Sequence, residues 1–121
     1  MASSSALKRK LSGSTDGKPI KIAAVATPGT DIHTAVAGTT AGTYDEIWLW
    51  AFNSAVVNVK LTIEFGGADA PDNNIIVTLP ALAGLIPVVP GLILQNSMTV
   101  KAFASSSNVI TIVGFVNAIT D

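Results

Sequence analysis

The sequence predicts an all-β fold in which two sheets pack together, a small β-sandwich or jelly roll with an extended N-terminal arm. From residue 20 onward, β-branched residues form short runs that end at Gly, Pro, Asn, Asp or Ser, which is the pattern of successive strands. No segment shows a convincing helical periodicity. The length of 121 residues suits one hydrophobic core, so we expect a single β domain.

The first 21 residues differ in composition from the rest, and we assign residues 1–21 to a flexible basic arm and residues 22–121 to the β-sandwich domain. The arm has five basic residues and one acidic residue, net +4, and the remainder has two basic and seven acidic residues, net −5. This charge separation predicts that the arm contacts a neighbouring protein surface. The residues expected to make that contact are Lys8, Arg9, Lys10, Lys18 and Lys21.

The first strand candidates are two short apolar runs, residues 20–26 and 32–36. Residues 47–52 form a stronger candidate, because both of its faces are apolar, and such a strand is central in a sheet or lies under a partner. We expect its aromatic residues to anchor the core or an interface, since large aromatic side chains dominate the energetics of both. These anchors are Trp48, Trp50 and Phe52.

Residues 57–65 are predicted to form a strand with one buried and one solvated face, because apolar and polar residues alternate without a break. The solvated positions include Lys60, Thr62 and Glu64. A loop follows, marked by two glycines and by Asp, Pro and Asn residues, and residues 74–80 then form the next strand.

Residues 85–95 contain two prolines and a glycine, which remove backbone donors and permit sharp bends. We therefore expect an edge strand or a corner between the sheets. Leu92 and Leu94 of this segment are further expected anchors of the core or an interface.

The last two predicted strands, residues 98–104 and 109–119, are joined by a connection short enough for a hairpin. Gly114 interrupts the second of them. A glycine inside a strand marks a bulge or a close approach of another backbone, so we expect one of the two there.

Residues that perform catalysis or hold metals are few, and none stands in a known motif. The chain has no cysteine and a single histidine, His33, which excludes thiolate chemistry and a zinc site with several nitrogen or sulfur ligands. Asp45 and Glu46 are adjacent and would point to opposite faces of a strand, so they cannot act together as acid and base. No G-x-S-x-G turn or phosphate-binding loop occurs. We expect no enzymatic activity, no metal and no cofactor.

The composition predicts that partners cover part of the surface. Hydrophobic residues make up 49% and charged residues 12% of the chain, whereas a soluble domain usually has about 25% charged residues. The apolar runs are shorter than the roughly 20 residues of a membrane-spanning helix, so no membrane partner is expected. The arm is small, and residues 22–121, which we call the body, are acidic overall. We therefore expect no specific nucleic-acid binding. We also expect no small-molecule ligand, although Trp48, Trp50 and Tyr44 offer a carbohydrate platform as an alternative.

The body contains four stretches with a characteristic overall pattern, IHTAVAGTTAGTYDEIWLWAFN, VKLTIEFGG, VTLPALAGLIPVVPGLILQNS and VKAFASSSNVITIVGFVNAI. They resemble small virion proteins of tailed bacteriophages, of the kind that decorate or cement the head shell. The resemblance extends from Ile32 to Ile119, does not include the arm, and contains no catalytic motif.

The resemblance implies a compact β domain on the exterior of the capsid, made in the host cytoplasm. It implies binding to the major capsid protein, clamping of adjacent capsomers, and self-association as trimers or dimers. Two alternatives stay open. One is a tail, baseplate or head-completion component, and the other is a carbohydrate-binding β module on the virion surface.

Overall fold

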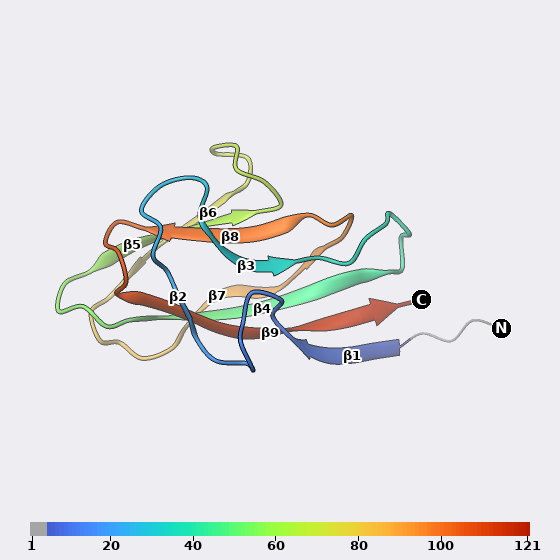
Figure 1. The fold of residues 1–121 in the computed structure, drawn as a ribbon, viewed down its shortest axis with the longest axis horizontal. Helices are drawn as coiled ribbons and strands as arrows, with labels where there is room; N and C mark the ends of the chain where they lie inside the picture. The colour runs from blue at the N-terminus through green and yellow to red at the C-terminus, as the bar shows by residue number, and fades with distance from the viewer. Residues whose placement is uncertain (1–4) are drawn as a thin grey trace.

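The computed structural model describes residues 5–121 and is all-β, which confirms the predicted fold class (Figure 1). Its strands are β1 (Ser5–Lys10), β2 (Ile20–Lys21), β3 (Thr30–Thr34), β4 (Tyr44–Asn53), β5 (Val59–Phe65), β6 (Asn74–Leu79), β7 (Ile86–Leu94), β8 (Thr99–Ala104) and β9 (Ile110–Thr120). Sheet A has the order β1–β9–β4–β7, with β2 also paired to β9, and sheet B has the order β3–β8–β5–β6. All pairs are antiparallel, and the two sheets pack together as a small sandwich.

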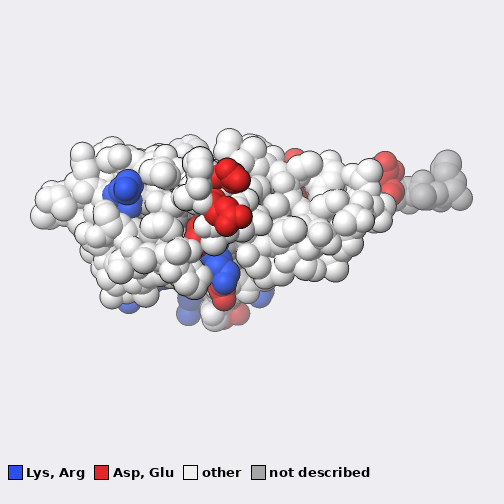
Figure 2. Space-filling model, turned by 90° about the horizontal axis from the view of Figure 1, so that it is seen from above, with Lys and Arg blue, Asp and Glu red and all other residues white. Residues whose placement is uncertain are grey.

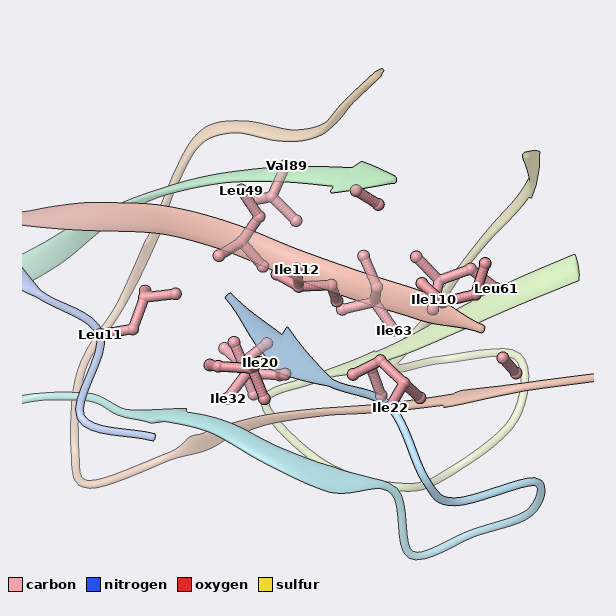
Figure 3. Close-up of a cluster of buried hydrophobic side chains, with 14 of the residues drawn as sticks. Leu11, Ile20, Ile22, Ile32, Leu49, Leu61, Ile63, Val89, Ile110 and Ile112 are labelled. Atoms are coloured by element: carbon pink, nitrogen blue, oxygen red, sulfur yellow. The ribbon is translucent and has the colours of Figure 1, made fainter. Parts of the chain in front are cut away.

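The core lies between the sheets and consists of the inward-facing residues of their strands. In β4, burial alternates residue by residue, so Ile47, Leu49 and Ala51 face inward and the aromatic residues face outward. Figure 3 shows buried side chains of both sheets meeting there, among them Leu61 of sheet B and Ile112 of sheet A. Each aliphatic side chain of this size that leaves water stabilises the fold by about 1.5–3 kcal/mol.

β4 is a central strand, as its two apolar faces predict. It pairs with β9 along its whole length, from Tyr44 opposite Ile119 to Asn53 opposite Ile110, and with β7 on its other side. Gly114 of β9 lies so close to β4 that a Cβ atom there would be 2.0 Å from the carbonyl oxygen of Trp48. The close backbone approach predicted for this glycine is confirmed, and the β4–β9 register continues across it without a bulge.

β7 is an edge strand of sheet A, as its prolines predict. Its pairing with β4 shifts register twice, once next to Pro90, which is opposite Trp48, and once next to Pro87, which is opposite Trp50. Proline has no amide hydrogen to donate to the ladder, so regular pairing is interrupted at these positions.

Part of the outward face of β5 is covered, although its alternation predicts a fully solvated face; Lys60 is exposed as predicted, whereas Thr62 and Glu64 are not. Thr62 is 3% exposed and Glu64 is 2% exposed. The segment between β2 and β3 lies over them, and Thr27 Oγ1 and the Gly29 amide donate hydrogen bonds of 2.5 and 2.7 Å to the carboxylate of Glu64. Burial of this carboxylate is tolerated because protein donors replace its water.

Residues 5–21 are part of the sandwich, which differs from the flexible arm expected for residues 1–21; residues 1–4 lie outside the described residues. β1 pairs with the second half of β9. Leu11 and Ile20 enter the core, 1% and 8% exposed. The physical reason is that the second half of β9 would otherwise present an unpaired edge. The predicted boundary after residue 21 therefore does not coincide with the start of the folded unit.

Candidate binding surfaces

Three aromatic side chains gather on the outer face of sheet A and form what we call the aromatic platform: Trp48, Trp50 and Phe115. Trp48 and Trp50 point outward because the alternate residues of β4 fill the core, and Phe115 is opposite Trp48 in the β9 register. The ring centroids lie 6.0–6.4 Å apart, with interplanar angles of 18–29°. All three rings are partly exposed. The predicted anchors Trp48 and Trp50 thus lie at the surface, and Phe52 follows them on the same face, also partly exposed.

Contacts on two sides determine the position of Trp48. Gly91 of β7 has a φ of +76°, and a Cβ atom there would lie 2.7 Å from Cζ2 of Trp48, so the indole occupies space that only a glycine leaves free. Glu46 Oε1 accepts hydrogen bonds of 2.8 Å from Trp48 Nε1 and 2.9 Å from Asn117 Nδ2. The platform is therefore a pre-ordered group of rings.

Charged groups adjoin these rings. The hydrogen bonds from Asn117 and Trp48 lower the pKa of Glu46 below its ordinary value of 4.5, because they stabilise the ionised form. The carboxylate is therefore negatively charged at neutral pH. Lys8 Nζ lies 4.2 Å from the centroid of the Phe115 ring, a cation–π contact. The platform thus contacts one anion and one cation.

The lowered pKa of Glu46 predicts a contribution to stability that depends on pH. The folded protein holds this carboxylate ionised more strongly than the unfolded chain does. The contribution is therefore complete above the ordinary value of 4.5 and is lost as the pH falls through the lower pKa of the folded state. Glu46→Gln has no charge to lose, so its urea midpoint is expected to fall less than that of the wild type between about pH 7 and about pH 3. Equal falls in the two proteins would contradict this role of Glu46.

The predicted arm residues do not form one cluster. β1 directs Lys8 and Lys10 to the face of the platform and Arg9 to the opposite face. Lys18 lies in the loop before β2, and Lys21 lies on β2 itself. All five side chains are exposed, so each is accessible to a partner, but they would meet it from different parts of the surface.

The two predicted anchors of β7 lie away from the platform. Leu92 is opposite Ile47 and Leu94 is opposite Asp45, both inward-facing residues of β4. Leu94 packs against the core, and Leu92 is 39% exposed at the edge of sheet A. Leu94 is therefore a partly buried residue at the margin of the core, and Leu92 is accessible at an edge that is separate from the platform.

A second surface, for which we made no prediction, lies at the end of the sandwich opposite the C-terminus (Figure 1). It consists of the β4–β5 loop, residues 54–58, and the β6–β7 loop, residues 80–85. Neither loop contains a charged residue, and Figure 2 shows no acidic side chain at this end in its view onto sheet B. Four large aliphatic side chains, 59–84% exposed, project from these loops and make up what we call the apolar tip: Val56, Val57, Leu82 and Leu85.

Asn53 holds the two loops of the apolar tip together. Its backbone oxygen accepts a 3.0 Å hydrogen bond from the Leu82 amide, and its side-chain amide donates 2.9 Å bonds to the carbonyls of Val57 and Leu79. Asn53 is 1% exposed, so this link is sheltered from water. The alternation had assigned Val57 to a strand, whereas β5 begins at Val59. In the sequence, the sign of this surface is that neither loop contains a charged residue.

His33 and Asp45 form a buried link between the two sheets, with Nε2 and Oδ2 2.7 Å apart. The Ser12 amide donates a 3.0 Å hydrogen bond to Nδ1, so we assign the ring hydrogen to Nε2, which donates to Asp45. The Ser12 hydroxyl accepts from the Thr34 amide at 2.8 Å, and no hydrogen bond within residues 5–121 joins this hydroxyl to the imidazole. The arrangement thus lacks the contact between nucleophile and base that serine hydrolases use.

Comparisons with protein-family models, with curated proteins and with solved structures give no match for this chain. Residues 5–121 contain no helix that would span a lipid bilayer. Over the same residues, no three His, Asp or Glu side chains are grouped so as to hold a metal ion. The aromatic platform and the apolar tip are the features from which a function can be inferred.

Proposed function

We propose that this chain is a structural protein of a tailed-bacteriophage virion that decorates and cements the outside of the head shell. It binds the major capsid protein and neighbouring copies of itself. The observation that carries the proposal is the apolar tip, because four exposed aliphatic side chains with no charge among them call for a partner that covers them. The resemblance of the sequence to decoration proteins is what suggests the capsid as that partner.

The position of the apolar tip suits insertion between capsid subunits. It lies at one end of the long axis of the molecule, and the C-terminus and β1 lie at the other end (Figure 1). The link through Asn53 pre-orders both loops, which reduces the entropy lost on binding. Apolar area removed from water contributes about 25 cal/mol per Å², and an interface of about 800 Å² per partner is usual for stable complexes. Repetition over a shell adds avidity.

The exposed basic residues of the predicted arm are the second proposed contact. β1 is an edge strand of sheet A, so Lys8, Arg9 and Lys10 are presented along an edge with unpaired backbone groups. An acidic surface of a neighbouring subunit would complement this edge in charge and in hydrogen bonding. Self-association as trimers or dimers remains part of the proposal.

The double variant Val56→Asp/Leu82→Asp is expected to bind shells at least about tenfold more weakly than the wild type, because two charges would lose water without finding partners. Shells that lack the protein are incubated with purified variant, and occupancy is measured by co-sedimentation and gel densitometry. Ile76→Asp is the matched control, since Ile76 is 57% exposed on β6, outside the loops of the tip. Urea midpoints show whether each variant is folded as stably as the wild type.

If the double variant and the wild type occupied the shells equally, the apolar tip would not be the contact with the shell. Absence of the chain from purified virions would overturn the proposed function altogether. Copy number separates the shell from the alternative of a tail, baseplate or head-completion component. A number comparable with that of the capsid subunits supports decoration, and a few copies per particle support the alternative.

A further inference from the structure

The aromatic platform is more ordered than an apolar docking patch requires. Its rings lie within 29° of parallel, and Trp48 is held between the glycine backbone at Gly91 and the carboxylate of Glu46. Aromatic faces carry a partial negative charge that attracts polarised C–H groups. Rigid, partly exposed rings of this kind suit a ligand with an apolar face and little flexibility of its own.

Polar atoms with unused hydrogen-bonding capacity adjoin these rings. Both hydrogen bonds to Glu46 end on Oε1, and none from within residues 5–121 reaches Oε2. Asn117 uses Nδ2 for the same carboxylate, and its Oδ1 remains an acceptor. The rim of the platform therefore offers two acceptor oxygens, one of them on an ionised group, beside the indole of Trp48.

A hydroxyl-rich ligand matches this rim better than an apolar protein surface does. An apolar partner would bury the ionised Glu46 without new donors, which is costly. A sugar donates hydroxyl hydrogens to the carboxylate and amide oxygens and places its C–H face on the rings. The ionised Glu46 at this rim repels carboxylate and phosphate groups, which favours an uncharged sugar over an acidic one.

We infer that the aromatic platform is a carbohydrate-binding site that accepts a neutral pyranose unit, stacked on Trp48 and Trp50 and hydrogen-bonded to Glu46 and Asn117. This site goes beyond the proposed function. It lies on the outer face of sheet A, whereas the proposed capsid contact is the apolar tip. A single site of this shallow kind binds at roughly millimolar Kd, because it contacts one side of the ligand only.

The test uses the isolated protein, titrated with short neutral oligosaccharides of gluco, galacto and manno configuration. Tryptophan fluorescence and amide NMR shifts are followed. We expect a saturable change with at least one sugar, and binding about tenfold weaker or more in Trp50→Ala. Glu46→Gln keeps an oxygen for Trp48 and Asn117 but removes the charge, so we expect several-fold weaker binding. Its urea midpoint at about pH 7 is expected to fall by no more than the lost charge accounts for, and its circular dichroism spectrum is expected to match that of the wild type. Val56→Asp/Leu82→Asp, altered only at the apolar tip, should bind sugar as the wild type does.

The absence of a saturable change with every sugar would overturn the inference, and so would sugar binding that persists undiminished in Trp50→Ala. A concentration-dependent dimer that Trp50→Ala abolishes, together with no sugar binding, would overturn it too and assign the platform to self-association. Because no shells are present in this titration, its outcome is independent of whether the apolar tip binds a capsid.

Discussion

Removal of residues 1–21 is expected to unfold the domain or leave it with little stability. Leu11 and Ile20 belong to the core, and loss of a buried aliphatic side chain costs about 2–5 kcal/mol. The deletion also removes β1 and β2, the strands that pair with β9 on the side away from β4. The combined loss is comparable with the whole stability of a small domain, about 5–15 kcal/mol. Circular dichroism and urea denaturation of the truncated protein measure it.

Two point variants distinguish core packing from the loss of chain length. Leu11→Ala is expected to lower the free energy of unfolding by about 2–5 kcal/mol. Leu7→Ala, at a position 53% exposed on β1, is expected to lower it by less than about 1 kcal/mol. A truncated protein with a near-native urea midpoint would contradict the packing of Leu11 and Ile20. It would also support the flexible arm that the composition predicts.

Gly114→Ala is expected to destabilise the fold by about 3 kcal/mol or more, at the upper end of what overpacking costs. The added Cβ atom would lie 2.0 Å from the carbonyl oxygen of Trp48, and both atoms belong to paired central strands that cannot separate without loss of hydrogen bonds. The same displacement would move Phe115 relative to Trp48, so we expect tryptophan emission to change. Urea denaturation and fluorescence spectra are the measurements.

Val113→Ala is the matched control, since it is the preceding residue of β9, partly exposed on the face of the platform. It is expected to cost about 1 kcal/mol and to leave the β4–β9 pairing intact. If Gly114→Ala were no more destabilising than this control, β4 and β9 would have to be farther apart than the structure places them.

The local sequence predicted the strands well where apolar and polar residues alternate clearly, or where Gly, Pro, Asn, Asp or Ser residues mark the ends of a run. The two apolar faces of β4 predicted a central strand or one under a partner, and the prolines of β7 predicted an edge strand or a corner. Gly114 predicted a bulge or a close backbone approach. In each case the structure shows the first or the second of these alternatives: β4 is central, β7 is an edge strand, and a close approach lies at Gly114. These features depend on neighbouring residues in the chain. Side-chain direction alternates along any strand, so they are readable before the partner strand is known.

The pairing of β1 and the burial of Thr62 and Glu64 on β5 could not be predicted in this way. The polar and basic residues of β1 resemble a solvated arm, and their pairing depends on the free edge that β9 offers more than a hundred residues later. Glu64 has the pattern of a solvated residue, and it is buried because Thr27 and Gly29 reach it from another segment. Contacts between distant segments depend on strand order and register, which local composition does not encode.

The same distinction applies to the two candidate surfaces. By itself, the sequence determined that Trp48 and Trp50 share one face of a strand, because residues two apart in a strand point the same way. Only the tertiary structure decided that this face is an outer one and that Phe115, Asn117 and Lys8 join it from two other strands. The apolar tip likewise exists because Asn53 joins two separate loops. A surface assembled from segments far apart in the chain is created by the packing of the sheets, so it becomes visible only when that packing is known.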